Sequence, residues 1–339
     1  MSEMGKYIYG IVSSDKELFF TSCKVIAGSD VYTIHYRDIA AVVSDKEVVD
    51  YNHLPKDNVA RYLISHQLVI ERVMEDFTII PMRLGTYALD EDEVRYTLVK
   101  GYPMIKDIFE RTHGKIEIDV VVTWSDFNGV LKEVAEEEEI REFKQILLGK
   151  KEGVTVDDQM KIGVLVKNHL YQKRERYAKE IGTSLAIISR NHKAHDLMND
   201  EMVLNMAFLI EKSRKENFEK MVEDLNTKFG EKLNFRCVGP LPLYSFNTLE
   251  VKKIQFNEIA LAKEKLNLRD LATKEGIKKA YRRQALVYHP DRTHRISDTE
   301  GQFEEVNRAY KLLLECCQEG VCSFKEEFAR DAIVVKIRD

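Results

Sequence analysis

The sequence predicts an α+β protein: two successive α+β units joined by a helical hairpin and followed by an all-helical C-terminal module. Three observations support this prediction. β-rich runs alternate with amphipathic helices in the first half, oppositely charged helical segments occupy the middle, and from residue 256 apolar residues recur at helical spacing. The 339 residues therefore divide into four segments: 1–125, 126–250, 251–320 and a tail, 321–339.

The first segment alternates strands with two long helices. We predict strands over residues 7–12, 31–36, 39–44, 78–81 and 116–124, and helices over 56–77 and 90–111. Pro55 precedes the first helix, and Glu91, Asp92 and Glu93 suit the positive end of the second. The order predicts helices on a mostly antiparallel sheet.

The middle of the chain contains two helical segments of opposite charge. Residues 127–148 are acidic, and residues 159–181 form a predicted helix with Asp157 as its N-cap. The exposed face of that helix is expected to be basic, with Lys167, Lys173, Arg174 and Arg176. Opposite charges favour a paired hairpin, although two separately solvated faces are an equal alternative.

The second α+β unit follows the hairpin. We predict strands over residues 184–189, 202–210 and 233–238, a helix over 215–229 and a polar loop over 189–200. Two prolines within residues 239–246 interrupt regular structure. Residues 332–337 of the tail form a strand that must dock on a sheet edge, because a lone strand is unstable.

Composition excludes several classes of protein. Hydrophobic residues make up 44% of the chain, too many for a disordered protein, and the net charge of −5 offers no basic excess for nucleic-acid binding. No apolar run approaches the roughly 18–20 residues that span a bilayer. The N-terminus lacks the features of a signal peptide. We expect a cytoplasmic protein without membrane insertion.

Metal and cofactor sites are not expected. The five cysteines are odd in number and suggest reduced thiols, and the cluster Cys316, Cys317 and Cys322 lacks a CxxC pair. His192 and His195 form an HxxH without a third ligand. The chain also lacks a P-loop, a dinucleotide fingerprint and an HExxH motif, so we expect no enzyme activity.

The C-terminal module contains a helix over residues 257–266, a helix capped by Thr273, and a third from about residue 298. The second helix has one apolar stripe: Ile277, Ala280, Tyr281, Ala285 and Tyr288. Four basic residues lie on its other side: Lys278, Lys279, Arg282 and Arg283. Pro290 ends the helix in a stiff turn that projects His289 and Asp291.

Residues 272–292 (ATKEGIKKAYRRQALVYHPDR) and 303–313 (FEEVNRAYKLL) together resemble J domains. The resemblance implies that the basic helix docks on an acidic Hsp70 surface and that the His-Pro-Asp loop promotes ATP hydrolysis by that partner. It assigns Hsp70 binding to His289, Pro290, Asp291, Lys278, Lys279, Arg282 and Arg283. An ordinary turn histidine and a solvated basic face are the alternatives. Gln284 and Gly276 depart from the family pattern, but neither lies in the loop.

The first 250 residues resemble the gas vesicle protein F/L family. The matching blocks, in the family's order, are residues 7–12, 66–86, 116–124, 202–222 and 235–246. The most specific are PMRLGT at 81–86 and GPLPLYSF at 239–246, where Leu84 and Leu243 are mild departures. The resemblance implies two ferredoxin-like domains in an accessory protein that keeps a hydrophobic shell protein from aggregating during gas vesicle assembly.

The partners implied are the shell protein, other gas vesicle accessory proteins and an Hsp70-type chaperone. Arg83 and Tyr244 are candidate client-binding residues, and a structural ion pair is an equal alternative for Arg83. A minor structural or scaffold component of the vesicle, whose J-like module only packs against other domains, is the alternative function.

Overall fold

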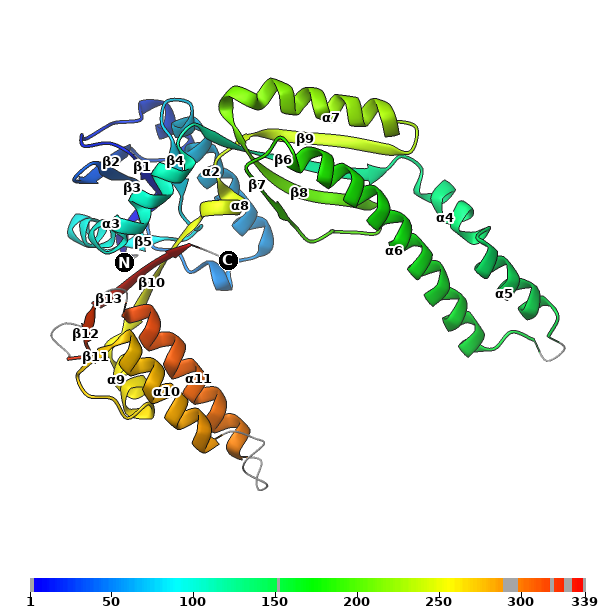
Figure 1. Cartoon of the computed structure of the whole chain (residues 1–339). Coiled ribbons are helices and arrows are strands. Elements are labelled where there is room, and N and C mark those ends of the chain that lie inside the picture. The colour runs from blue at the N-terminus through cyan, green and yellow to red at the C-terminus, as the bar shows by residue number, and fades with distance from the viewer. Residues whose placement is uncertain (1–2, 151–152, 289–297, 318–319, 326–330, 338–339) are drawn as a thin grey trace. The chain divides into compact units, whose positions relative to one another are not determined.

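The computed structural model describes residues 3–150, 153–288, 298–317, 320–325 and 331–337 (Figure 1). The chain forms two compact units. The first comprises residues 1–72, 82–107 and 249–339, and the second comprises residues 73–81 and 108–248. The C-terminal module therefore belongs to the same unit as the N-terminal segment, an association that local sequence patterns do not indicate.

The first unit is built on an antiparallel sheet. Its strands are β1 (Met4–Val12), β2 (Val31–Tyr36), β3 (Ile39–Glu47) and β5 (Tyr87–Ala88). The order is β2-β3-β1, with β5 also paired to β1. Further elements are η1 (Thr21–Cys23), α1 (Lys24–Ala27), η2 (Tyr51–His53), α2 (Lys56–Met74) and α3 (Glu91–Thr112). The short strand β4 (Ile79–Pro81) falls within residues 73–81 of the second unit. All five predicted strands and both long helices are confirmed as elements, but the strand predicted over 116–124 belongs to the second unit. The two-residue β5 was not predicted.

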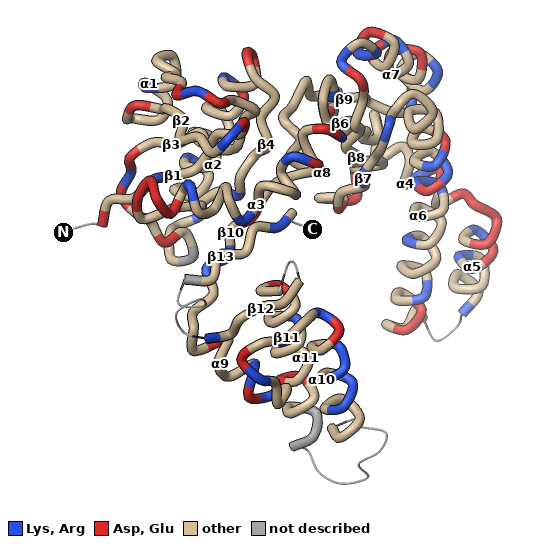
Figure 2. The backbone as a smooth tube through the Cα atoms, turned by 60° about the vertical axis from the view of Figure 1, so that its left-hand side comes forward, with Lys and Arg blue, Asp and Glu red and all other residues tan. Residues whose placement is uncertain are grey.

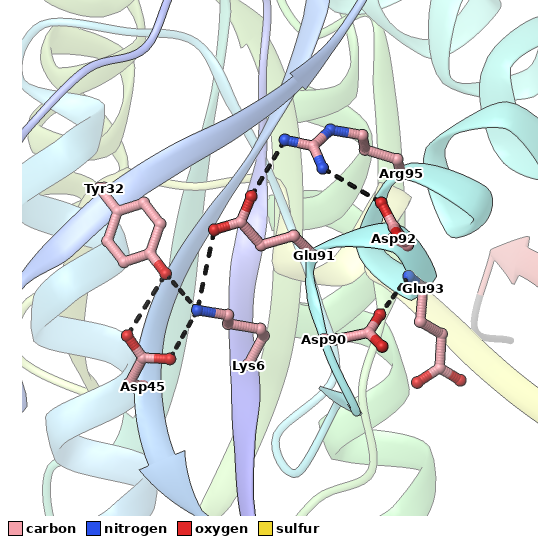
Figure 3. A network of polar contacts seen from close by, with 8 residues as sticks. All are labelled: Lys6, Tyr32, Asp45, Asp90, Glu91, Asp92, Glu93 and Arg95. Atoms are coloured by element: carbon pink, nitrogen blue, oxygen red, sulfur yellow. Dashed lines mark hydrogen bonds and ion pairs between the residues drawn. The ribbon is translucent and has the colours of Figure 1, made fainter.

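A charged network joins this sheet to the start of α3 (Figure 3). Lys6 Nζ on β1 lies 2.7 Å from Asp45 Oδ1 on β3 and donates to Tyr32 OH on β2 at 2.7 Å. Glu91 of α3 approaches the same amine at 4.0 Å. Burial lowers the pKa of Lys6, but the hydrogen bonds to Asp45 and Tyr32 outweigh it and raise that pKa above its usual value. The charged amine therefore holds three strands and a helix together.

The second unit contains another antiparallel sheet, with strand order β7-β8-β6-β9. Its strands are β6 (Lys115–Trp124), β7 (Asn191–Ala194), β8 (Met202–Glu211) and β9 (Leu233–Leu241). The helical elements beside them are η3 (Lys212–Arg214), α7 (Lys215–Phe229) and α8 (Tyr244–Asn247). The polar loop predicted over 189–200 is partly wrong, because it contains β7. All four β7 residues are exposed, so the strand has no apolar alternation.

The helical hairpin comprises α4 (Phe127–Ala135), α5 (Glu138–Leu148) and α6 (Val156–Ala186). The strand predicted over 184–189 is wrong: α6 continues to Ala186 because Leu185 is fully buried in the core of the unit. The N-cap is Thr155 rather than Asp157, since Thr155 and Asp158 form a reciprocal capping box.

A hydrogen bond and an ion pair confirm that the acidic and basic helices pack together. His169 Nε2 on α6 lies 3.0 Å from Glu139 Oε2 on α5, and Lys173 pairs with Glu133 of α4. The side chains of Lys173 and Arg174 are only 15% and 14% exposed, so these two do not belong to the solvent-exposed face predicted for them.

The C-terminal module is helical, with four short strands around it. Its helices are α9 (Phe256–Lys265), α10 (Lys274–Tyr288) and α11 (Asp298–Cys316). The strands are β10 (Leu249–Gln255), β11 (Leu271–Thr273), β12 (Val321–Ser323) and β13 (Asp331–Ile337). Antiparallel pairs form between β10 and β13 and between β11 and β12. The predicted tail strand is thus confirmed as β13, and its partner β10 was not predicted.

The core of this module contains the predicted apolar stripes. Ile277 and Ala280 of α10 are fully buried with Val306 and Leu313 of α11. The rings of Tyr281 and Tyr310 stack at 4.1 Å. The predicted fold class, two antiparallel α+β sheets with a helical hairpin and a helical C-terminal module, is therefore confirmed. One expectation is wrong: Cys317 and Cys322 form a disulfide, because the chain after α11 returns to the helices.

Candidate functional site

The exposed face of α10 is the first candidate site. Lys278, Lys279, Arg282 and Arg283 are all exposed, and Figure 2 shows the basic stretches along this helix. Burial of Ile277 and Ala280 on the opposite face turns the four basic side chains outward. Thr273 Oγ1 accepts from Gly276 N–H at 3.1 Å and caps the helix.

No carboxylate among the described residues pairs with any of these four cations. The remaining predicted Hsp70-binding residues, His289, Pro290 and Asp291, lie outside the described residues. The face is consequently a cluster of positive charge without a counterion from the described part of the chain. Such a face can attract an acidic partner by electrostatic steering.

The turn at residues 81–86 is the second candidate site, and its backbone is fixed by buried polar groups. Tyr7 OH donates to His66 Nδ1 at 2.7 Å, and His66 Nε2 donates to the Met82 carbonyl at 3.0 Å. Burial lowers the pKa of His66 to about 4, so its imidazole is neutral at pH 7. The neutral ring with its proton on Nε2 satisfies both partners.

Gly85 completes this turn. Its φ is +84°, and a Cβ at this position would lie 2.9 Å from the Tyr51 ring. Both the left-handed backbone and the close ring require glycine. Thr86 Oγ1 donates to the Arg83 carbonyl at 2.7 Å and closes the turn. The residues of this motif therefore specify a backbone shape.

Arg83 projects from the turn toward β10. Its backbone N–H donates to the Leu249 carbonyl at 2.8 Å, and its guanidinium pairs with Glu250. The contacts are those of a structural ion pair, although the side chain remains 50% exposed. Client binding by Arg83 stays a prediction.

Tyr244, the other candidate for client binding, begins α8 in the second unit and is partly buried. Its neighbour Ser245 forms a cluster that no motif in the sequence predicts. Ser245 N–H donates to Glu117 Oε2 at 3.0 Å, and Ser245 Oγ donates to Glu117 Oε1 at 2.7 Å. His195 Nε2 lies 3.0 Å from the same hydroxyl.

Glu117 is 1% exposed, and burial raises its pKa to about 7 despite the hydrogen bonds from Ser245. The serine proton already bonds to the carboxylate, so His195 is not placed to remove it as a general base would. The sequence signal for this cluster was the charged residue Glu117, which occupies a buried position of β6. The cluster fastens the segment around α8 to the sheet.

Other signals in the sequence lead to no site. His192 and His195 are not brought to a common ligand position: His192 lies beside the Phe208 ring, whereas His195 contacts Ser245. Across the described ranges, no group of three or more His, Cys, Asp or Glu side chains is arranged to hold a metal ion. Nor does any described helix have the length and apolarity to cross a membrane.

The family described as gas vesicle synthesis protein GvpL/GvpF matches residues 5–248, and the DnaJ domain family matches residues 253–316. The chain belongs to the GvpL/GvpF family. This GvpL/GvpF chain is 24% identical over 197 residues to gas vesicle protein F of Microcystis aeruginosa, covering 56% of the chain and 78% of that relative. Gas vesicle protein F of Haloferax mediterranei is 22% identical over 250 residues, covering 72% and 94%.

Solved structures show the same fold. The crystal structure of GvpF from Anabaena sp. PCC7120 superposes with a TM-score of 0.61 at 24% identity, covering 73% of this chain and 99% of the other. The C-terminal module of the GvpL/GvpF chain is 52% identical over 50 residues to the chaperone protein DnaJ of Helicobacter hepaticus, covering 15% of this chain and 13% of DnaJ. The junction between the two matched regions coincides with β10, which begins at Leu249.

Proposed function

We propose that this protein is a gas vesicle assembly factor that holds the hydrophobic shell protein and recruits an Hsp70-type chaperone to it. The observation that supports the proposal is the presence, in one chain, of a GvpL/GvpF region and a DnaJ domain with an exposed basic helix. The role is one of binding, without catalysis by this chain.

A physical need for such an arrangement follows from the chemistry of the client. A shell subunit that polymerises through apolar surfaces exposes them before assembly, and exposed apolar surface aggregates. A protein that binds both the subunit and a chaperone increases their effective concentration with respect to each other. Other gas vesicle accessory proteins are further proposed partners, and association with the growing vesicle is the proposed location.

The test uses full-length protein with purified Hsp70 and shell protein. We expect the wild type to stimulate the Hsp70 ATPase and to co-purify with the shell protein. His289→Gln should abolish stimulation and retain the shell protein. His192→Gln, an equivalent change on exposed β7, is the matched control and should behave as the wild type. Stimulation that survives His289→Gln would contradict recruitment by the DnaJ domain.

A structural role in the vesicle is the second candidate, because the tail packs into the core of the DnaJ domain. Phe324 and Val334, both from the tail, are buried with the helices α9, α10 and α11. In that case the protein would remain in purified mature vesicles, and His289→Gln would change neither vesicle yield nor ATPase activity.

A further inference from the structure

A groove of about 810 Å³ lies beside α10, between that helix, the connection from α9 to β11, and strand β12. It is bounded partly by chain that follows the three helices, so the DnaJ helices alone do not form it. Its walls combine four basic residues with two exposed apolar ones: Arg269, Lys279, Arg282, Arg283, Leu271 and Val321.

Among the described residues that line the groove, the charge is entirely positive: none of them is Asp or Glu, and none of the four cations has an ion-pair partner in the described part of the chain. Lys279 and Arg283 are one helical turn apart and repel each other slightly. A carboxylate entering the groove would relieve that repulsion, so the charge complements an acidic ligand.

The groove also has an apolar rim. Leu271 on β11 is 60% exposed and Val321 on β12 is 64% exposed. The two strands pair, with Thr273 opposite Val321 and Leu271 opposite Ser323. A ligand that fits both features is a protein segment carrying carboxylates and at least one apolar side chain.

The β12 wall is part of the folded module. Phe324 N–H, just after the strand, donates to the Asp270 carbonyl at 2.7 Å, and the Phe324 side chain is only 2% exposed. The disulfide between Cys317 and Cys322 joins the same strand to the chain at the end of α11. Strand pairing, a buried ring and a covalent link thus hold the wall beside α10.

We propose that this groove binds an acidic segment of the Hsp70-type partner, so that Arg269 and strand β12 extend the docking surface beyond α10. The inference rests on the proposed recruitment of an Hsp70. It adds a contact that the three helices by themselves do not provide, and it gives the segment after the helices a part in partner selection.

The experiment measures Hsp70 ATPase stimulation as a function of the concentration of full-length protein. Arg269→Glu reverses a charge in the groove, and we expect the half-maximal concentration to rise about tenfold with the same maximal rate. Val321→Glu should act in the same direction. Arg308→Glu is the matched control, because Arg308 is exposed on α11 outside the groove. It should shift the half-maximal concentration less than twofold.

The outcomes separate the two proposals. If the wild type gives no stimulation, or if His289→Gln stimulates fully, recruitment itself fails and the groove proposal fails with it. If the wild type stimulates, His289→Gln does not, and Arg269→Glu stays within twofold of the wild type, the groove proposal alone is overturned. A tenfold shift for Arg269→Glu with an unchanged control supports it. Circular dichroism of each variant establishes that the fold is intact.

Discussion

Strands β1 and β6 lie inside the two antiparallel sheets, and each holds a neighbouring segment through a buried polar group. Burial shifts the pKa values of these two groups in opposite directions. On β1, Tyr7 reaches the 81–86 turn through His66, whose pKa burial lowers to about 4. On β6, Glu117 holds Ser245, and burial raises the pKa of Glu117 to about 7. Similar sheets with a similar order of elements therefore differ in how they respond to pH.

The sign of each response follows from proton linkage. The pKa of His66 is about 4 in the folded protein and 6.5 at its ordinary value, so the unfolded chain binds the proton more tightly. The first unit therefore loses stability as pH falls from 6.5 to 4. The pKa of Glu117 is about 7 in the folded protein and 4.5 at its ordinary value, so the folded chain binds the proton more tightly. The second unit therefore loses stability as pH rises from 4.5 to 7. Each shift corresponds to about 3 kcal/mol.

The largest expected effect comes from His66→Ala. It creates a cavity and leaves Tyr7 OH and the Met82 carbonyl without their present partner, which costs about 3–5 kcal/mol. Amide hydrogen exchange of β1, measured by mass spectrometry across pH 4 to 7, should show lower protection and a weaker acid dependence. Gln67→Ala, at the next position on α2, is the control and should change protection by less than about 0.5 kcal/mol. Equal effects of the two variants would contradict the anchoring role.

Glu117→Gln tests the other half of the comparison. The amide does not titrate, so the loss of protection in β6 between pH 4.5 and 7 should disappear, leaving the variant about 2–3 kcal/mol more stable than the wild type at pH 8. Asp119 and Lys193 act on the carboxyl in opposite directions and remain in place. Glu223→Gln on the exposed side of α7 serves as the control. A persistent pH slope in the variant would assign the response to another group.

Gly85→Ala probes the shape of the turn. The left-handed φ and the Tyr51 ring both resist a Cβ, so the first unit should lose about 1–2 kcal/mol. The same substitution at Gly163, inside α6 with open space around it, should instead stabilise its helix by about 0.5–1 kcal/mol. Urea unfolding monitored by hydrogen exchange compares them. A neutral Gly85→Ala would mean that the turn relaxes.

Arg83→Ala should have the smallest effect on stability. Its ion pair with Glu250 is half-exposed, and such pairs contribute about 0.5 kcal/mol. A binding assay with the shell protein gives the discriminating result: weaker binding with unchanged stability would support a client contact. Lys115→Ala, at the start of β6 in the second unit, is the control and should leave binding unchanged. If neither variant alters binding, Arg83 has a structural role alone.

The sequence was sufficient where periodicity and local motifs determine structure. The apolar stripe of α10 and the alternation in β6 located those elements within one or two residues. The strand prediction for residues 184–189 is wrong because their apolar run fits a buried strand as well as the last turn of a buried helix. Strand β7 was missed because it has no buried face. The pairing of β10 with β13, the partner of Arg83 and the contact between Glu117 and Ser245 depend on residues far apart in the chain, which no local pattern records.

The pairing of β10 with β13 also places the entrance and exit of the DnaJ domain side by side, with Gln255 opposite Asp331. Everything between these residues is topologically a hairpin loop, and the entropy of closing such a loop grows only slowly with its length. Closure entropy therefore sets only a weak limit on what occupies residues 256–330. A replacement module must also cover Ile254 and Val334, the residues of β10 and β13 that pack against the DnaJ helices.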